Sequence, residues 1–260
     1  MPPGDRTVPS DSPTAVTALT NEQIQFFKNN GFLILHGLIE PAVVEVWQEA
    51  IWSHLGTDPH DPSTWKRDYV VEGLQLPDGT NLNQQAGVKR IVEQLGDGAF
   101  AGGGGAPLIK WPEPEKAEEW SLPNDGHVDG YGPGGWSPFM LGATAYVFDV
   151  EHQGGGFTYW PKSHFSAWRY LLDNPETVDG SFRDREGFTW LWFLDDEAEG
   201  PCEFAGKAGD VVLWHSYLFH TGSMNVRERP RIAFFGRWSH RDRESFKYEI
   251  PEDLWKRWAI

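Results

Sequence analysis

Apolar residues near the start of the chain recur at helical spacing in two segments, each framed by residues typical of helix ends. Thr20 begins a capping box and Gly31 suits a helix stop. Pro41 suits a first helical turn, and Gly56 follows the last apolar position of that second pattern. The sequence therefore predicts two helices, with a strand at 32–36 between them.

From Phe139 onward, short apolar runs alternate with turn residues. They predict strands at 139–150, 157–160, 211–217 and 231–238, a helix at 164–173 and a helix that starts at Pro251. Short strands that follow a helical front favour an antiparallel β core with flanking helices. Neither an internal repeat nor a linker divides residues 19–260, which we predict to be one domain after a flexible tail at 1–18.

The middle of the chain is rich in Gly, Pro, Asp and Asn, and we expect mostly loop at 57–85 and 97–137. The glycine run at 101–106 cannot hold one conformation cheaply. Two interpretations stay open for this run. It is either a floppy connector or the hinge of an active-site lid.

Composition narrows the choice of partners. Lys and Arg number 22 against 38 Asp and Glu, a net charge of −16 that argues against nucleic acid or an anionic membrane as the main partner. No apolar run is long enough to span a membrane or to form a signal peptide, and Cys202 is the only cysteine. We expect a cytoplasmic protein without an intramolecular disulfide or a thiolate-rich metal site.

Two distant segments carry residues suited to metal chemistry. His127 and Asp129 are two positions apart, so on a strand their side chains share one face. His215 and His220 follow a later turn, and Arg231 opens the next apolar run. Two histidines and one carboxylate with open positions form the facial triad of non-haem Fe(II) oxygenases. A buried Arg suits a dicarboxylate co-substrate, because its planar fork matches a carboxylate.

Taken together, these segments resemble the phytanoyl-CoA dioxygenase family of Fe(II)- and 2-oxoglutarate-dependent oxygenases. The resemblance covers roughly residues 19–238 and rests on the matching segments Leu19–Leu35, His127-Val-Asp129, Gly155–His164, Gly209-Asp210, His215, His220, Asn225 and Arg231. It implies a double-stranded β-helix, that is, a cupin-like jelly-roll with the metal inside its mouth. It also implies Fe(II), 2-oxoglutarate and O2 as cofactor and co-substrates.

By the same resemblance, the metal ligands are His127, Asp129 and His220, whereas His215 is not a ligand and His164 is structural. Arg231 binds the far carboxylate of 2-oxoglutarate, and Thr144 on the first long strand assists it. The chain departs from the family at Gly222, where a hydroxyl residue often bonds the co-substrate, and the neighbouring Ser223 is a candidate substitute.

The implied reaction couples decarboxylation of 2-oxoglutarate, which yields succinate and CO2, to oxidation of a substrate C–H bond. Asp129 occupies the position that related halogenases leave small for chloride, so we expect hydroxylation or another oxidation instead of halogenation. The acidic chain has no obvious basic cluster for the phosphates of coenzyme A. A small or medium organic metabolite, uncharged or cationic, fits it better.

Aromatic residues near the site are candidates for the substrate pocket or for the barrel core: Tyr131, Trp136, Phe139, Phe157 and Trp160. The segment 186–196, with Trp190, Trp192 and Phe193, resembles an insertion over the mouth. Two other function classes stay open. One is a cupin-like metalloenzyme that does not use 2-oxoglutarate, and the other is a non-catalytic jelly-roll that binds a ligand.

Overall fold

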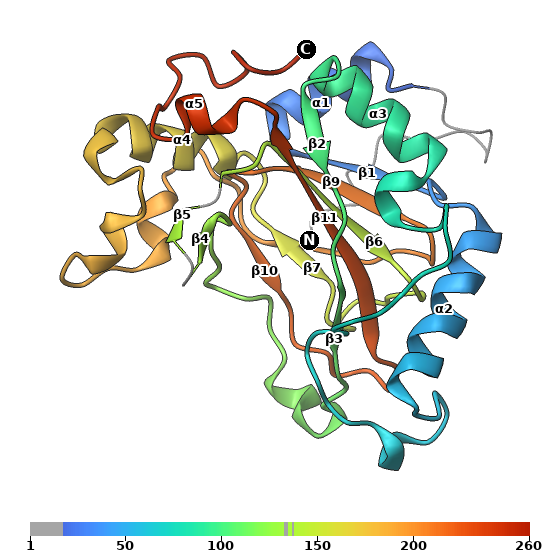
Figure 1. Cartoon of the computed structure of the whole chain (residues 1–260). Coiled ribbons are helices and arrows are strands. Elements are labelled where there is room, and N and C mark those ends of the chain that lie inside the picture. The colour runs from blue at the N-terminus through green and yellow to red at the C-terminus, as the bar shows by residue number, and fades with distance from the viewer. Residues whose placement is uncertain (1–17, 133–134, 137) are drawn as a thin grey trace.

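Two antiparallel sheets face each other in the computed structural model, which describes residues 18–132, 135–136 and 138–260 (Figure 1). The strands are β1 (Phe32–Leu35), β2 (Phe100–Gly102), β3 (Pro107–Lys110), β4 (Tyr131–Gly132), β5 (Gly135–Trp136), β6 (Leu141–Tyr146), β7 (Phe157–Tyr159), β8 (Cys202–Phe204), β9 (Val211–His215), β10 (His220–Gly222) and β11 (Arg231–His240). The major sheet runs β1-β9-β6-β11-β2, with β3 also on β11, and the minor sheet runs β10-β7-β8.

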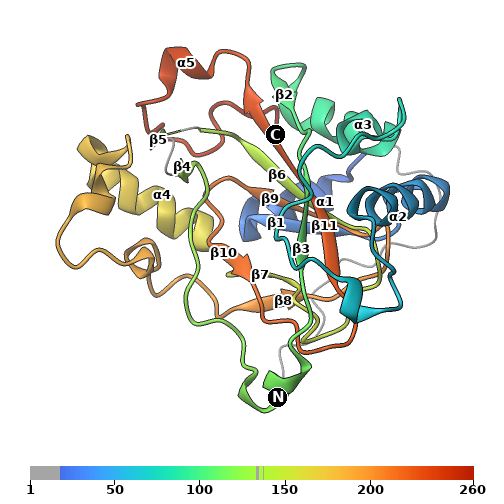
Figure 2. The ribbon, with the colours of Figure 1, turned by 60° about the horizontal axis from the view of Figure 1, so that its bottom comes forward.

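The α-helices are α1 (Asn21–Asn30), α2 (Pro41–Leu55), α3 (Ala86–Gly96), α4 (Ser163–Asp173) and α5 (Arg243–Phe246). Short 3-10 helices are η1 (Pro62–Thr64), η2 (Leu82–Gln84), η3 (Pro114–Glu119), η4 (Pro175–Thr177), η5 (Ser181–Asp184) and η6 (Trp190–Phe193). Helices α1, α2 and α3 lie along the outer side of the major sheet, and α4 lies near β4 and β5 (Figures 1 and 2). Within the described residues, no helix combines the length and the apolarity needed to span a membrane.

Strand alternation separates two apolar cores. On β11, Ile232, Phe234 and Trp238 belong to the core that the major sheet forms with α1, α2 and α3. Ala233 and Phe235 point the other way, into the core between the two sheets. The mainly β jelly-roll with flanking helices is therefore confirmed, and its interior face is the odd-numbered face of β11.

Helices α1 and α2 begin and end at the residues that the sequence predicted. The Thr20 side chain accepts a hydrogen bond from the Gln23 backbone amide, and Gly31 ends α1 in the left-handed region at φ +80°. Pro41 opens α2, and Gly56 ends it at φ +60°. Gly31 has a further constraint, because a Cβ there would lie 2.5 Å from Nδ1 of the buried His164.

The glycine run at 101–106 is neither a floppy connector nor a lid hinge. It passes through β2, which pairs with the end of β11, and continues toward β3, which pairs with its beginning. A Cβ at Gly103 would lie 2.1 Å from the Trp238 indole, and one at Gly105 would lie 2.3 Å from the Phe235 carbonyl oxygen. These glycines are therefore required by close backbone approach to β11.

Other predictions need correction. The segment 97–137 contains strands as well as loop, because β2 and β3 pair with β11. The long strand expected at 139–150 is only β6, Leu141–Tyr146. Pro251 does not begin a helix, because the last residues form single turns such as the Lys256 amide to the Asp253 carbonyl. The tail predicted at 1–18 lies almost wholly outside the described residues, and the single domain at 19–260 stays a prediction.

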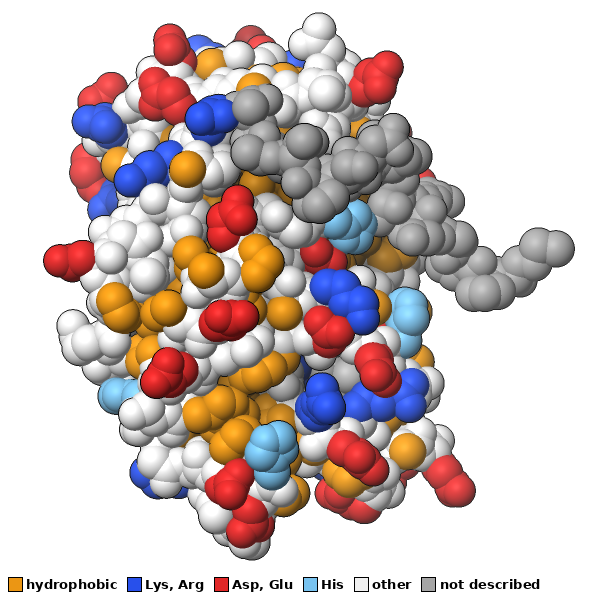
Figure 3. Space-filling view, turned by 90° about the vertical axis from the view of Figure 1, so that its right-hand side faces the viewer, with side chains coloured by type: hydrophobic (Ala, Val, Ile, Leu, Met, Phe, Trp, Pro, Cys, Tyr) orange, Lys and Arg blue, Asp and Glu red, His pale blue; other side chains and the backbone are white. Residues whose placement is uncertain are grey.

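On the face of the molecule seen in Figure 3, Lys and Arg side chains are interspersed with Asp and Glu. Apolar side chains lie between them on the same face. This mixture of signs is consistent with a surface exposed to water.

Candidate metal centre

Three of the predicted site residues converge at the mouth of the barrel. His127, Asp129 and His220 each offer one ligand atom, and these atoms all lie within 4.8 Å of one another. Asp129 Oδ1 lies 3.2 Å from His127 Nε2, and Asp129 Oδ2 lies 3.7 Å from His220 Nε2. Two imidazole nitrogens and one carboxylate therefore face a common point.

The backbone explains how residues almost a hundred positions apart meet. His127 and His220 form an antiparallel bridge, in which each backbone amide donates to the other residue's carbonyl. His220 is the first residue of β10, which pairs with β7 in the minor sheet. Asp129 comes two residues after His127 and shares its side of the segment.

The orientation of His220 is fixed on several sides. Its Nδ1 lies 2.8 Å from the Leu218 carbonyl oxygen, which can only accept, so Nδ1 carries the proton and Nε2 presents a lone pair. The imidazole packs between the Phe157 and Trp214 rings, at centroid distances of 5.1 and 4.6 Å. Gly142 makes room for Trp214, because a Cβ there would lie 2.2 Å from the indole.

The surroundings of Asp129 and His220 favour the protonation states that bind a metal cation. Burial alone would raise the pKa of Asp129, but its contacts with the His127 and His220 imidazoles, together with the positive charge of Arg237, hold it far below its ordinary value. Burial lowers the pKa of His220 despite the neighbouring carboxylate. The carboxylate is therefore ionised and His220 is neutral near pH 7, the states in which both bind metals.

Arg231 lies deeper in the barrel and is only 3% exposed. Its Nε donates to the Gly155 carbonyl at 2.7 Å, and its Nη1 lies 3.4 Å from the Leu108 carbonyl. No carboxylate among the described residues forms an ion pair with it, and burial lowers its pKa. Burying a cation without an anionic partner carries a large desolvation cost. Arg231 is therefore a candidate for binding an anionic ligand.

Gly222 lies directly beside this guanidinium, since a Cβ there would lie 3.3 Å from Arg231 Nη2. Gly222 is also two residues after His220 on β10, so both residues face the same side of the strand. Ser223 does not replace the missing hydroxyl, because its own hydroxyl donates to the buried Glu203 carboxylate. The departure from the family pattern thus leaves Arg231 without a hydroxyl partner from Gly222 or Ser223.

Thr144 lies on the inner face of β6, where it pairs with Phe235 on β11. It is fully buried, and its Oγ1 accepts a hydrogen bond from Trp214 Nε1 at 3.2 Å. The hydroxyl proton therefore remains available to donate to another group. Tyr146, on the same face, donates to the Phe204 carbonyl and accepts from the Phe157 amide, so its hydroxyl belongs to the framework.

The other histidines of the resemblance are structural in their contacts. His215 stacks on Trp258, and its Nδ1 accepts from the Tyr217 amide. His164 Nε2 lies 3.0 Å from the Lys28 carbonyl oxygen. Neither belongs to the cluster of converging ligand atoms.

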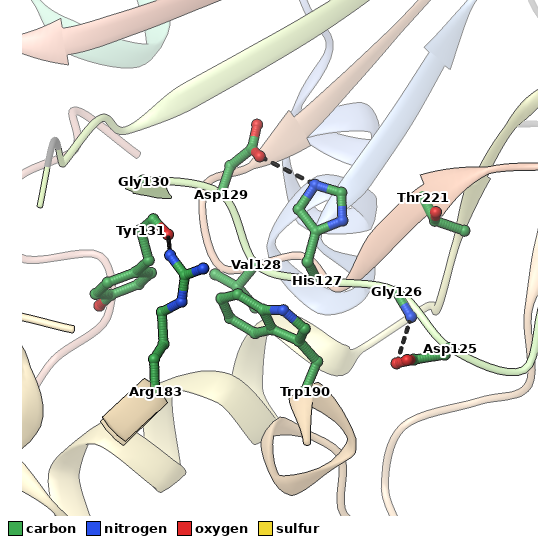
Figure 4. A pocket seen from close by; sticks show the side chains of 10 residues that line it. All are labelled: Asp125, Gly126, His127, Val128, Asp129, Gly130, Tyr131, Arg183, Trp190 and Thr221. Carbon is green, nitrogen blue, oxygen red and sulfur yellow. Dashed lines mark hydrogen bonds and ion pairs between the residues drawn. The ribbon is translucent and has the colours of Figure 1, made fainter. Parts of the chain in front are cut away.

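A cavity of about 480 Å³ opens on the metal centre (Figure 4). His127 and Asp129 lie on one side of it, with Thr221 of β10 nearby, and Asp125 reaches it from the preceding loop. Trp190 of η6 and Arg183 of η5 form the opposite side, and Arg183 donates to the Tyr131 carbonyl. The segment 186–196 therefore contributes to the mouth, as predicted, through Trp190.

The remaining aromatic candidates divide between pocket and core. Tyr131 lines the cavity. Phe139, Phe157 and Trp160 are buried in the apolar cores, and Phe193 is too. The Trp136 side chain lies outside the described part of the structure.

Sequence reasoning missed Arg237, whose Nε donates to Asp129 Oδ2 at 2.8 Å and whose Nη2 donates to the same oxygen. Arg237 follows Arg231 by six positions on β11, so period two already puts both on one face. That periodicity was the available signal. Arg183 and Asp125 carried no comparable signal, because their places depend on irregular loops.

Comparison of the sequence with protein-family models and with curated proteins gives no match. The structure is similar to several solved structures. The non-heme alpha ketoglutarate dependent carbocyclase SnoK from nogalamycin biosynthesis has a TM-score of 0.60 and 19% identity, with 88% of this chain and 87% of that chain covered. HygX from Streptomyces hygroscopicus, with nickel and 2-oxoglutarate bound, has a TM-score of 0.54 and 18% identity, with 85% and 87% covered.

The non-heme alpha ketoglutarate dependent epimerase SnoN, also from nogalamycin biosynthesis, has a TM-score of 0.53 and 16% identity, with 84% of this chain and 82% of that chain covered. At these identities the likeness concerns the fold, and function has to be argued from the site. The chain shares its jelly-roll fold with these enzymes.

Proposed function

We propose that this chain is an Fe(II)- and 2-oxoglutarate-dependent oxygenase that oxidises a C–H bond of a small or medium organic metabolite. The observation that carries the proposal is the combination of two features inside the barrel. One is the convergence of His127, Asp129 and His220, and the other is the buried Arg231 without an anionic partner. The co-substrate would connect them.

The donor set fits iron. Two imidazoles and one carboxylate that leave further positions open are the ligands of non-haem Fe(II) oxygenases. His220 Nδ1 is committed to the Leu218 carbonyl, so only Nε2 is available to a metal. His127, Asp129 and His220 would therefore hold the ion.

The spacing between the metal ligands and Arg231 fits a dicarboxylate. From His220 to Gly222 the strand rises by two residues, about 7 Å, and Gly222 borders Arg231. A five-carbon dicarboxylate that chelates the metal with one end could reach the guanidinium with the other. Arg231 would bind its far carboxylate, and Thr144, with its hydroxyl proton available, would assist.

When bound, the iron supplies the redox chemistry with O2, through which 2-oxoglutarate becomes succinate and CO2 while the substrate is oxidised. The protein's own residues bind, orient and exclude water. Trp190 and Tyr131 line the cavity that opens on the ligands, and Phe157 and Trp214 flank His220. The presence of Asp129 supports hydroxylation or another oxidation in preference to halogenation.

The cavity of about 480 Å³ suits a metabolite, since small-molecule sites span roughly 300–1,000 Å³. A HygX structure contains hygromycin B, and a SnoN structure contains nogalamycin RO, so this fold accommodates organic substrates in those proteins. The net charge of −16 supports an uncharged or cationic substrate over a coenzyme A ester. We further propose that residues 19–260 form one domain and that the protein is cytoplasmic.

An anaerobic titration tests the proposal. Fe(II) and then 2-oxoglutarate are added to metal-free protein, and the visible charge-transfer band of a chelated 2-oxo acid is recorded. We expect the band in the wild type and its loss in His220→Ala, because that variant lacks a ligand. Iron binding without the band would favour a cupin-like metalloenzyme that does not use 2-oxoglutarate. Failure to bind iron would favour a ligand-binding jelly-roll.

A further inference from the structure

Arg237 contacts the carboxylate of the metal centre directly. Both its Nε and its Nη2 donate to one oxygen of Asp129, Oδ2, and the Nε bond is 2.8 Å long. Oδ2 also lies 3.7 Å from His220 Nε2, whereas Oδ1 lies 3.2 Å from His127 Nε2 and accepts no hydrogen bond from Arg237. The two oxygens of Asp129 are therefore in different environments.

The guanidinium of Arg237 also packs over two aromatic rings. The guanidinium lies over the Phe139 ring at 5.8 Å and over the Trp214 ring at 5.9 Å. Trp214 is also the ring that flanks His220, so one indole supports both. Among the described residues Arg237 pairs with no other carboxylate, although its side chain is 44% exposed. A half-exposed arginine that pairs inward points to a role at the site.

We propose that Arg237 is a positioning residue that holds Oδ2 of Asp129 and so restricts this carboxylate to binding the metal through its other oxygen. The inference rests on the proposed function. With three protein donor atoms, an octahedral ion keeps three positions for other ligands. If both carboxylate oxygens bound the ion, only two positions would remain. The co-substrate chelate would fill both, and O2 would have none.

Metal affinity is a poor test of this role, because two effects oppose each other. A cation close to a divalent ion weakens metal binding by repulsion. A ligand that is held in the correct orientation strengthens it. The number of water molecules on the metal is the direct observable, since it reports the positions that the protein leaves open.

The experiment compares three variants. Arg237→Met keeps an apolar stem over Phe139 and Trp214 but removes every donor. Arg237→Lys restores a single donor and should recover part of the effect. Phe139→Leu is the matched control, because it removes a ring under the guanidinium and leaves the donors to Asp129 in place. Thermal unfolding of each variant identifies any that fail to fold.

Mn(II), a paramagnetic ion of the same divalent series, serves as the probe, and water-proton relaxation counts its exchangeable waters. Without 2-oxoglutarate we expect three waters in the wild type and in Phe139→Leu, and two in Arg237→Met. Because this measurement needs no co-substrate, it remains informative even if the proposed function is wrong. An equal count in the wild type and in Arg237→Met would overturn the proposal.

The Fe(II) enzyme gives a second readout. We expect the anaerobic charge-transfer band to form in Arg237→Met but to decay at least about tenfold more slowly on mixing with O2. Decay at the wild-type rate would contradict the inference. Equal slowing in Phe139→Leu would also overturn it, since that result would assign the effect to packing around the ring instead of to the bond to Asp129.

Discussion

Replacing Arg231 with Gln should weaken 2-oxoglutarate binding and leave iron binding unchanged. The guanidinium donates to the Gly155 and Leu108 carbonyls through Nε and Nη1, whereas Nη2 finds no acceptor within the described structure. Nη2 lies 3.3 Å from the point that a Cβ of residue 222 would occupy. A neutral amide can retain a bond to a carbonyl, but it cannot offer a charged donor to a carboxylate.

The size of the effect follows from burial. With 3% of Arg231 exposed, water screens the interaction little. A hydrogen bond to a charged group contributes about 1.5–3 kcal/mol, and each 1.4 kcal/mol corresponds to about tenfold in affinity. The dissociation constant of 2-oxoglutarate should therefore rise by roughly 10- to 150-fold. Iron affinity should stay the same because Arg231 does not contact the three ligands.

The assay is anaerobic titration of the visible band with 2-oxoglutarate at saturating Fe(II). Arg227→Gln is the matched control, because Arg227 Nε also donates to a carbonyl of the same loop, that of His152, at 2.8 Å. We expect this control to bind 2-oxoglutarate as the wild type does. An Arg231→Gln variant with wild-type affinity would refute the assignment, and so would loss of iron from a folded Arg231→Gln protein.

Three further predictions concern single positions. Gly222→Ser adds a hydroxyl beside the buried guanidinium and should tighten 2-oxoglutarate binding by about 2- to 10-fold in the same titration; unchanged affinity would argue against a co-substrate carboxylate there. Gly103 has φ +81°, and a Cβ there would lie 2.1 Å from the Trp238 indole, so Gly103→Ala should lower the free energy of unfolding by more than about 2 kcal/mol. Gly200 has open space around it, so the control Gly200→Ala should change the free energy of unfolding by less than about 0.5 kcal/mol. Urea unfolding measures both. Burial lowers the pKa of His164 to about 4. The unfolded chain, with an ordinary value of about 6.5, therefore takes up the proton first, and the free energy of unfolding should fall by up to about 1.4 kcal/mol per pH unit between pH 6.5 and 4; a His164→Gln variant with an equally steep profile would contradict this.

Local rules were sufficient where an element's ends are set by its own residues. The Thr20 capping box and the glycines at 31 and 56 define α1 and α2 without reference to the rest of the chain. The same rules failed for the glycine run, because its conformation is set by contact with Trp238 and Phe235 more than 130 positions away. A flexible connector and a closely packed strand can have the same glycine-rich composition. Only the contacts with the partner strand distinguish the two.

The candidate site shows the same division. The spacing of His127 and Asp129 predicts a shared face, but nothing local indicates that His220 will bridge to His127. That pairing came from the resemblance to a family. Strand alternation predicts that Arg237 lies on the same face of β11 as Arg231. Its contact with Asp129, however, depends on how the loop at 125–131 lies against the end of β11.

Strand β11 links the stability of the barrel to the geometry of its site. Its odd positions carry Arg231 and Arg237 toward the interior, while its even positions bury Ile232, Phe234 and Trp238 under the helices. A slip of one residue would turn both arginines into the helix-covered core and would remove Ile232, Phe234 and Trp238 from it. Each large apolar side chain contributes about 1.5–3 kcal/mol on burial, and Arg237 would also lose its charged partner Asp129. The apolar positions on the helix-covered side of β11 therefore fix the register that directs Arg237 to Asp129 and Arg231 to the proposed co-substrate site.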